Sequence, residues 1–189
     1  LSLIWEKIAL DKKSIRQMMK EKRLLLNQET FSLYNQSIYH QVIHHPYYQS
    51  AKLIACYVSL QYEVDTISLI KKTLETHRVC VPKVHGDIMH FYEIESLDDL
   101  KEGCFHVLEP ITTKQIQPQD IDLMIVPLLA FDQFKYRVGY GKGYYDKYFA
   151  SGYQGYKLGL AFSFQYIHSI DIDQYDYCLD EIIVENILE

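Results

Sequence analysis

Continuously apolar segments alternate along this chain with segments whose apolar residues repeat as they do in helices. The clearest apolar segments are AKLIACYVSL at residues 51–60 and IDLMIVPLL at residues 121–129, where Pro127 ends the predicted strand. The six predicted strands cover residues 51–60, 77–84, 87–94, 121–129, 156–163 and 180–186. Strands that are apolar on both sides are typical of parallel sheets covered by helices. The sequence therefore predicts a mainly parallel sheet.

Three segments have the residue pattern of helices. The first runs from Lys12 to about His44, before Pro46. Its apolar stripe consists of Ile15, Met18, Met19, Leu25 and Leu26. The second lies within residues 63–75, with Asp65 or Thr66 as its cap. The third is opened by a glycine-rich run and continues through Tyr148. Strands and helices in this order predict a three-layer, Rossmann-like α/β sandwich with helices on both faces of the sheet.

The composition is that of one globular domain. The chain has 189 residues, of which 48% are hydrophobic and 23% charged. We expect residues 1–189 to form a single domain, with residues 1–11 as a flexible or peripheral extension. No segment reaches the roughly 20 apolar residues that a membrane span needs, and the first residues lack the basic start of a secretory signal. The sequence predicts a cytoplasmic protein without membrane association.

The charge and the cysteines exclude other classes of protein. A formal net charge of −6 argues against a nucleic-acid binder, which needs a broad basic surface. The four cysteines, Cys56, Cys80, Cys104 and Cys178, are far apart and form no CxxC pair. Buried free thiols are therefore expected, in preference to disulfides or a zinc site.

The run RVGYGKGYYDKYF, residues 137–149, has glycine at every second position from Gly139 to Gly143. It follows a predicted buried strand, at the edge where α/β sheets bind ligands. Glycines there let backbone N–H groups approach a phosphate, and Arg137 and Lys142 would neutralise its remaining charge. Asp146 could hold Mg²⁺ beside the phosphates. A flexible turn, with Asp146 stabilising the first turn of a helix, is an equally good interpretation of the spacing alone.

Two further elements carry charge at suitable positions. Lys12 and Arg16 are four residues apart and would project from one face of a helix, although a solvated basic face has the same pattern. Glu63, in the segment EVDT, follows a buried strand and could accept hydrogen bonds from a polar heterocycle. It could also be incidental to a helix cap formed by Asp65 or Thr66.

Together these motifs resemble those of the 5-formyltetrahydrofolate cyclo-ligase family, also called methenyltetrahydrofolate synthetases. The matching segments are, in chain order, KKSIR with Arg23, EVDT, VPKV with MHFY, Glu109-Pro110, VPLLAFD, RVGYGKGYYDKYF, KLGLAFSFQ and LDEII. The pattern RxGxGKGYYD joined to VPxxxFD is the most specific part of the match. The resemblance covers most of the chain.

The resemblance implies an enzyme that uses ATP and Mg²⁺ to convert 5-formyltetrahydrofolate to 5,10-methenyltetrahydrofolate, with release of ADP and phosphate. The formyl oxygen would be phosphorylated before the ring closes. The implied catalytic residues are Arg137, Lys142 and Tyr145. The implied ATP-binding residues are Lys12, Arg16, Arg137, Val138, Gly139, Tyr140, Gly141, Lys142, Gly143, Tyr144 and Tyr145. The implied folate-binding residues are Val58, Glu63, Tyr140, Gly141, Lys142, Gly143 and Tyr144.

For the metal, the resemblance implies Asp146 with Asp180 as a second acidic contributor. The implied partner is the small folate substrate, and the protein would be a monomer or a small homo-oligomer. Two positions depart from the family: many relatives have Arg at Tyr140 and Gly at Lys135. Loss of the Arg predicts weaker ATP affinity, for which Lys135 could compensate from the loop.

Two other functions remain compatible with the residues. A non-catalytic nucleotide- or folate-binding module would use the same glycine run without the acidic metal ligands. A sugar-phosphate isomerase or a CoA-transferase-like enzyme would use a carboxylate as base or nucleophile and would not need ATP, since one fold supports many activities.

Overall fold

A seven-stranded sheet forms the centre of the computed structural model, which describes residues 11–103 and 107–187. The strand order is β11-β10-β7-β1-β2-β3-β6. These strands are β1 (Leu53–Cys56), β2 (Arg78–His85), β3 (Ile88–Ile94), β6 (Gln115–Ile116), β7 (Leu123–Pro127), β10 (Tyr156–Leu160) and β11 (Glu181–Ile183). The strands from β11 to β2 pair in parallel, and β3 and β6 are antiparallel. The predicted α/β fold with a mainly parallel sheet is confirmed.

Two short pairs of strands lie outside the sheet. β4 (Leu100–Glu102) pairs with β5 (Leu108–Pro110), and β8 (Ala130–Phe131) pairs with β9 (Arg137–Val138). The β8–β9 pair directly follows β7, so it directs the chain from the end of the central strand into the glycine run. None of these four strands was predicted, because segments of two or three residues have no visible periodicity.

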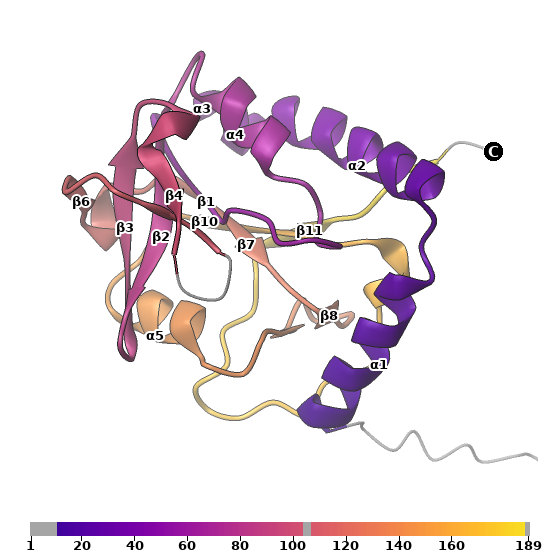
Figure 1. Ribbon diagram of the computed structural model, residues 1–189. Coiled ribbons are helices and arrows are strands. Elements are labelled where there is room, and N and C mark those ends of the chain that lie inside the picture. Colours follow the sequence, from indigo (N-terminus) through magenta and orange to yellow (C-terminus); the bar gives the residue numbers. More distant parts are fainter. Residues whose placement is uncertain (1–10, 104–106, 188–189) are drawn as a thin grey trace, which may run out of the picture.

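Helices cover both faces of the sheet (Figure 1). The helices are α1 (Lys12–Leu24), α2 (Gln28–Ile43), α3 (Pro46–Ser50), α4 (Ile67–Thr73) and α5 (Tyr144–Ala150). Ile38 of α2 and Ile70 of α4 pack with Ile54 on one face. Tyr148 and Phe149 of α5 belong to the cluster on the other face. The helix α1 packs through Ile15 and Met19 against Val138 of β9, which fixes this helix beside the glycine run.

The single helix predicted from Lys12 to about His44 is wrong. The chain forms α1 and α2, and the break lies at residues 25–27. Asn27 caps α2 by accepting a hydrogen bond from the Thr30 N–H, and Leu25 is 83% exposed instead of belonging to the apolar stripe. Asn favours such a cap over a helix interior because its side chain bonds to the backbone.

The structure also bears on the chain's first residues and its cysteines. Residues 1–10 and Cys104 lie outside the described residues, whereas Asp11 belongs to α1 as its cap. Cys56 and Cys80 are buried free thiols, as expected, and Cys178 is free and exposed. Within residues 11–103 and 107–187, no helix is both long and apolar enough to cross a bilayer.

Candidate active site

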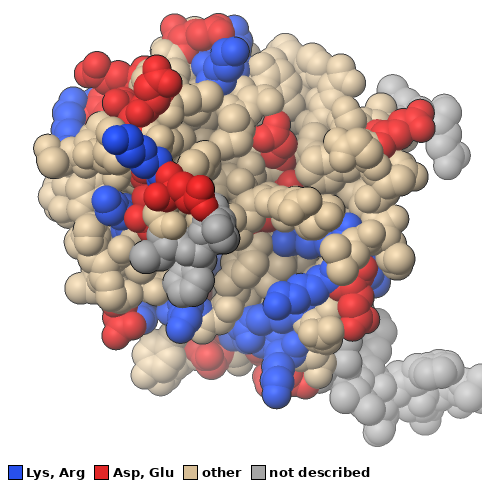
Figure 2. Space-filling model, in the orientation of Figure 1, with Lys and Arg blue, Asp and Glu red and all other residues tan. Residues whose placement is uncertain are grey.

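A cavity of about 740 Å³ opens beyond Pro127, the last residue of β7. Its lining comprises Lys12, Arg16, Pro127, Arg137, Gly139, Tyr140, Gly141, Lys142, Gly143, Tyr144, Tyr145, Asp146, Lys147, Ala150, Asp173, Gln174, Tyr175, Asp176 and Tyr177. Most of the glycine run and two basic residues of α1, Lys12 and Arg16, therefore meet at one place. Figure 2 shows lysine and arginine side chains gathered on the lower half of the face seen in Figure 1.

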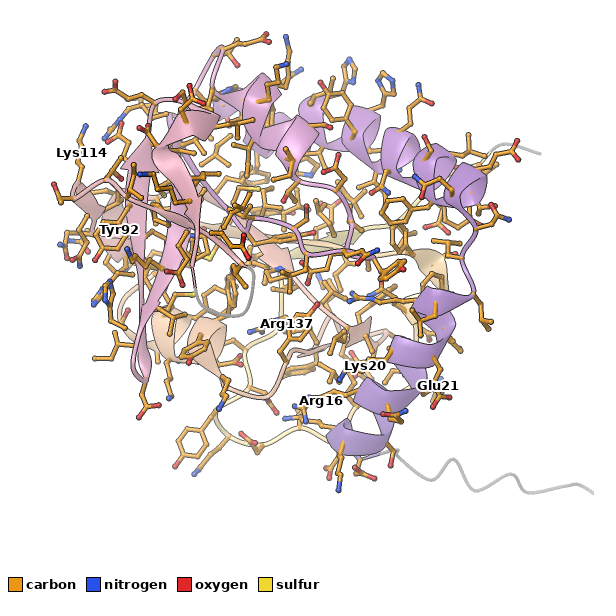
Figure 3. The ribbon with its side chains drawn as sticks, viewed as in Figure 1. Arg16, Lys20, Glu21, Tyr92, Lys114 and Arg137 are labelled. Carbon is orange, nitrogen blue, oxygen red and sulfur yellow. The ribbon has the colours of Figure 1, made fainter. Side chains whose placement is uncertain are left out.

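Arg16 connects α1 to the glycine run. Its Nε donates a hydrogen bond to the Gly139 carbonyl at 2.8 Å. A Cβ at position 141 would lie 3.3 Å from the guanidinium carbon of Arg16, and Gly141 has φ +100°. A side chain at position 141 would thus be both strained and crowded. In Figure 3, Arg16 extends from α1 toward the glycine run, and Arg137 lies between α1 and α5.

Two more cations of the cavity, Lys12 and Lys142, differ in their partners. Lys12 forms an ion pair with Asp176 and lies 3.7 Å from an Asp173 oxygen. Lys142 is exposed and forms no ion pair with any described residue. Its charge is therefore available to a ligand. The residues from Asp173 to Tyr177 form a wall of the cavity that sequence reasoning missed, because DQYDY has no spacing typical of a site.

Arg137 and Asp146 form a two-pronged ion pair. The Arg137 nitrogens donate to the two Asp146 oxygens at 3.1 and 3.2 Å, and the Tyr177 N–H donates to Asp146 at 3.1 Å. The Arg137 side chain is 5% exposed and the Asp146 side chain 22% exposed. The Arg137 guanidinium also lies 5.3 Å from the Phe149 ring centre. These contacts hold both charges in fixed positions at the first turn of α5.

The side chains of the cavity offer few ligands for Mg²⁺. No cluster of three or more metal-ligating side chains occurs among the described residues. Mg²⁺ at phosphates commonly uses only one or two carboxylates, together with water and phosphate oxygens. Asp146 lines the cavity, and Arg137 and Tyr177 use three of the about four lone-pair sites of its carboxylate, which leaves one for a metal ion. One carboxylate plus substrate phosphates is therefore compatible with the residues present.

Asp180 does not join Asp146 in the lining of the cavity. Its carboxylate forms an ion pair with Lys157 at 2.9 Å and accepts the Lys157 N–H at 2.7 Å. Lys135, which was considered as a compensating cation, donates to the Asp180 carbonyl and is also absent from the lining. Neither residue lines the cavity, and their roles at the metal and the phosphates stay predictions.

Glu63 lies against the glycine run, through Tyr140. The Tyr140 hydroxyl donates a short hydrogen bond to Glu63 Oε1, and the Leu60 N–H donates to Glu63 Oε2 at 2.7 Å. Arg23 donates to the Tyr140 hydroxyl at 3.0 Å and to the Leu128 carbonyl at 3.0 Å. Glu63 and Arg23 are 5% and 8% exposed. The half-exposed Tyr140, 48% exposed, thus joins two buried charges in a chain of charge-assisted hydrogen bonds.

Burial is the largest influence on the pKa values of Glu63, Tyr140 and Tyr145. Burial raises the pKa of Glu63, while the Tyr140 hydroxyl, the Leu60 N–H and the Arg23 charge act in the opposite direction. Burial, followed by the Glu63 charge, raises the pKa of Tyr140, which therefore remains a neutral donor at physiological pH. Burial likewise raises the pKa of Tyr145 well above its ordinary value.

Arg23 was recognised in the sequence only as part of a motif. Its place, seven residues after Arg16, puts both arginines on one face of α1, and this spacing was the available signal. Two other predicted residues lie outside the lining: Val58 is buried in the core after β1, and the Val138 side chain packs on α1. Only backbone atoms of Val138 could reach a ligand.

A cation-lined cavity, framed by glycines at the end of a parallel strand, is typical of α/β proteins that bind small polyanions. The family model of the 5-formyltetrahydrofolate cyclo-ligases matches residues 8–185. The chain therefore belongs to the 5-formyltetrahydrofolate cyclo-ligase family, and the predicted membership in this family of ligases is confirmed.

Individual relatives agree with the family match. The chain is 31% identical to 5-formyltetrahydrofolate cyclo-ligase of Mycoplasma genitalium, with coverage of 92% of this chain and 97% of the relative. It is 28% identical to the mouse cyclo-ligase, with coverage of 93% and 94%. The NMR structure of Aquifex aeolicus 5,10-methenyltetrahydrofolate synthetase has a TM-score of 0.83 at 30% identity, with coverage of 94% and 96%.

Proposed function

We propose that this enzyme uses ATP and Mg²⁺ to cyclise 5-formyltetrahydrofolate to 5,10-methenyltetrahydrofolate, with release of ADP and phosphate. The observation that carries the proposal is the cavity in which Lys12, Arg16, Arg137 and Lys142 surround a glycine run, in a chain of this family. The reaction needs ATP and the folate side by side. The cavity and the neighbouring Glu63 supply one region for each.

The triphosphate occupies the cavity in this proposal. Gly139, Gly141 and Gly143 leave backbone N–H groups free of side-chain obstruction, and Arg16 and Lys142 supply charge. The helix α5 has only seven residues, so its dipole contributes little and the side-chain cations provide most of the attraction. Charge-assisted hydrogen bonds contribute about 1.5–3 kcal/mol each, so a few of them suffice for micromolar binding after the loss of ligand freedom.

Asp146 is the residue that would hold Mg²⁺ between the protein and the phosphates. The ion would neutralise charge on the phosphate oxygens during transfer. Arg137 orients the Asp146 carboxylate through its two hydrogen bonds. Asp180 is a weaker candidate, because its carboxylate is engaged with Lys157.

The folate would place the N–H groups of its pterin on the Glu63 carboxylate, beside Val58. Its formyl oxygen would then face the γ-phosphate. Attack of that oxygen on phosphorus forms an O–P bond and breaks the bond to the β-phosphate, which releases ADP. The N10 nitrogen then attacks the formyl carbon, the C–O bond to phosphate breaks, and N10 loses its proton.

Phosphoryl transfer mainly requires positioning and neutralisation of charge, and no side-chain nucleophile. Arg137, Lys142 and Tyr145 are the residues that we assign to this task. Burial keeps the Tyr145 hydroxyl protonated, so it is a donor to an oxygen that gains negative charge. The Arg137 guanidinium lies 5.9 Å from the Tyr145 ring centre, which keeps the two residues together.

The test is to mix the protein with 5-formyltetrahydrofolate, Mg²⁺ and ATP and to follow the near-ultraviolet absorbance of the methenyl product. We expect product only when ATP is present. A non-catalytic binding module would give binding without product. An isomerase or a CoA-transferase-like enzyme would give no ATP-dependent signal, and either result would refute the proposal.

Three further predictions accompany this function. We expect a cytoplasmic enzyme that binds neither nucleic acid nor membranes, and a monomer or small homo-oligomer. Sedimentation of the purified protein measures the oligomeric state, and fractionation of the source cells measures the location.

A further inference from the structure

The Glu63 carboxylate accepts hydrogen bonds from two donors, and a ligand could displace only one of them. Glu63 is 5% exposed, and each of its oxygens already accepts a hydrogen bond. The donor Leu60 belongs to the same turn, since the Glu63 N–H donates back to the Leu60 carbonyl at 3.1 Å. Tyr140 comes from a different part of the chain, the glycine run. The Leu60 N–H is fixed within the turn, so a ligand that takes the place of a present donor on Glu63 displaces the Tyr140 hydroxyl.

The position of Tyr140 depends on the same backbone that faces the cavity. Its neighbours are Gly139, whose carbonyl accepts from Arg16, and Gly141, which lies against the Arg16 guanidinium. Arg16 also lines the cavity, so a bound phosphate competes with Gly139 for its donors. Glycine on both sides gives the Tyr140 backbone freedom to rearrange when these contacts change.

Arg23 makes the closed arrangement stable in the absence of ligands. Arg23 donates to the Tyr140 hydroxyl, which donates to Glu63, so the hydroxyl connects a buried cation with a buried anion. The Arg23 Nε is buried without a partner. Withdrawal of Tyr140 would deprive Glu63 of a donor and Arg23 of an acceptor, so a ligand that replaces the hydroxyl must donate to Glu63 and accept from Arg23.

We propose that Tyr140 is a latch that couples the two ligand sites: its hydroxyl occupies Glu63 in the free enzyme, and nucleotide binding to the glycine run withdraws it so that the folate can bind. This inference rests on the proposed function, because it takes the folate as the ligand of Glu63. Coupling of this kind is reciprocal, so the folate must also increase the affinity for the nucleotide.

The experiment measures the dissociation constant of 5-formyltetrahydrofolate by calorimetry, alone and with a saturating non-hydrolysable ATP analogue. For the wild-type enzyme we expect the analogue to tighten folate binding about tenfold or more, as expected for one charge-assisted hydrogen bond. For Tyr140→Phe we expect tight folate binding without the analogue and a ratio near one. Tyr140→Leu serves as a second variant and should also remove the coupling.

Tyr153→Phe is the matched control, because the Tyr153 hydroxyl donates to the Tyr156 carbonyl at 2.9 Å outside the cavity lining. Its coupling ratio should equal that of the wild type. Folate binding that is unaffected by the analogue in the wild type, or coupling that persists in both Tyr140 variants, would overturn the latch. Absence of any folate binding while the nucleotide binds would instead overturn the substrate assignment and, with it, the latch.

Discussion

Replacement of Asp146 by Asn separates the structural role of this residue from its proposed metal role. Asp146 is the only acidic partner of the Arg137 guanidinium among the described residues, and the Arg137 side chain is 5% exposed. Removal of one partner from a fully buried pair costs about 3–5 kcal/mol. Asp146 is 22% exposed and Asn keeps one acceptor oxygen, so we expect a loss of about 2–3 kcal/mol in the free energy of unfolding.

Urea denaturation measures this loss, and the assay for the methenyl product measures turnover at increasing Mg²⁺. We expect the stability loss to be independent of Mg²⁺, whereas higher Mg²⁺ should partly restore turnover. An unfolding free energy within about 0.5 kcal/mol of the wild type would refute the electrostatic reasoning. Turnover that does not respond to Mg²⁺ would restrict Asp146 to a structural role.

Asp180→Asn provides the comparison. The Lys157 and Asp180 side chains are 20% and 39% exposed, so their ion pair contributes at most about 1 kcal/mol. Asp180 also lies outside the cavity lining. We therefore expect a small change in stability and the same Mg²⁺ dependence as in the wild type. A marked shift in that dependence would restore Asp180 as a metal ligand.

Three more predictions concern single residues. Lys142→Ala should reduce turnover strongly with an unchanged urea midpoint, because Lys142 is exposed; a shifted midpoint would contradict this. Gly141→Ala should raise the Michaelis constant for ATP and lower stability by about 1–3 kcal/mol, since position 141 has φ +100° and lies beside Arg16; an unchanged variant in both assays would refute the required geometry. Hydrogen bonds from Arg78 and then Lys114 lower the pKa of Glu93 to about 2, although burial acts in the opposite direction. The ionised Glu93 therefore stabilises the fold fully above its unfolded pKa near 4.5, and this stabilisation is lost as the pH falls from there toward about 2. The stability of Glu93→Gln, measured against pH, should lack this loss at acid pH. The same dependence of stability on pH in the variant and the wild type would disprove the prediction.

The sequence was sufficient for the parallel core and for the place of the cavity. β1 and β7 are apolar on both faces, and the glycine run follows β7 closely enough to lie at its carboxyl end. The break between α1 and α2 was missed, because the apolar spacing continues across Asn27. A local hydrogen bond, invisible in the periodicity, decides that boundary.

The contacts within the site depend on the folded chain and could not be predicted in the same way. Tyr140 and Glu63 are 77 residues apart, and only the packing of the turn after β1 against the glycine run brings them together. The same holds for Lys12, whose partner Asp176 lies 164 residues away. Each residue type suggested a role by itself, but the pairing of opposite charges is a tertiary property.

The distribution of charge is consistent with the proposed binding of a polyphosphate by an acidic protein. The formal net charge is −6, yet the cavity is lined by five cationic side chains and three acidic ones. An extended nucleic acid would meet the negative remainder of the surface, whereas a small polyanion meets only the local positive excess. Lys12 and Arg137 are also held by Asp176 and Asp146 before any ligand arrives. These acids orient the cations and lower their attraction for phosphate. Neutralisation of Asp176 should therefore tighten nucleotide binding, while Lys12 should be less well positioned.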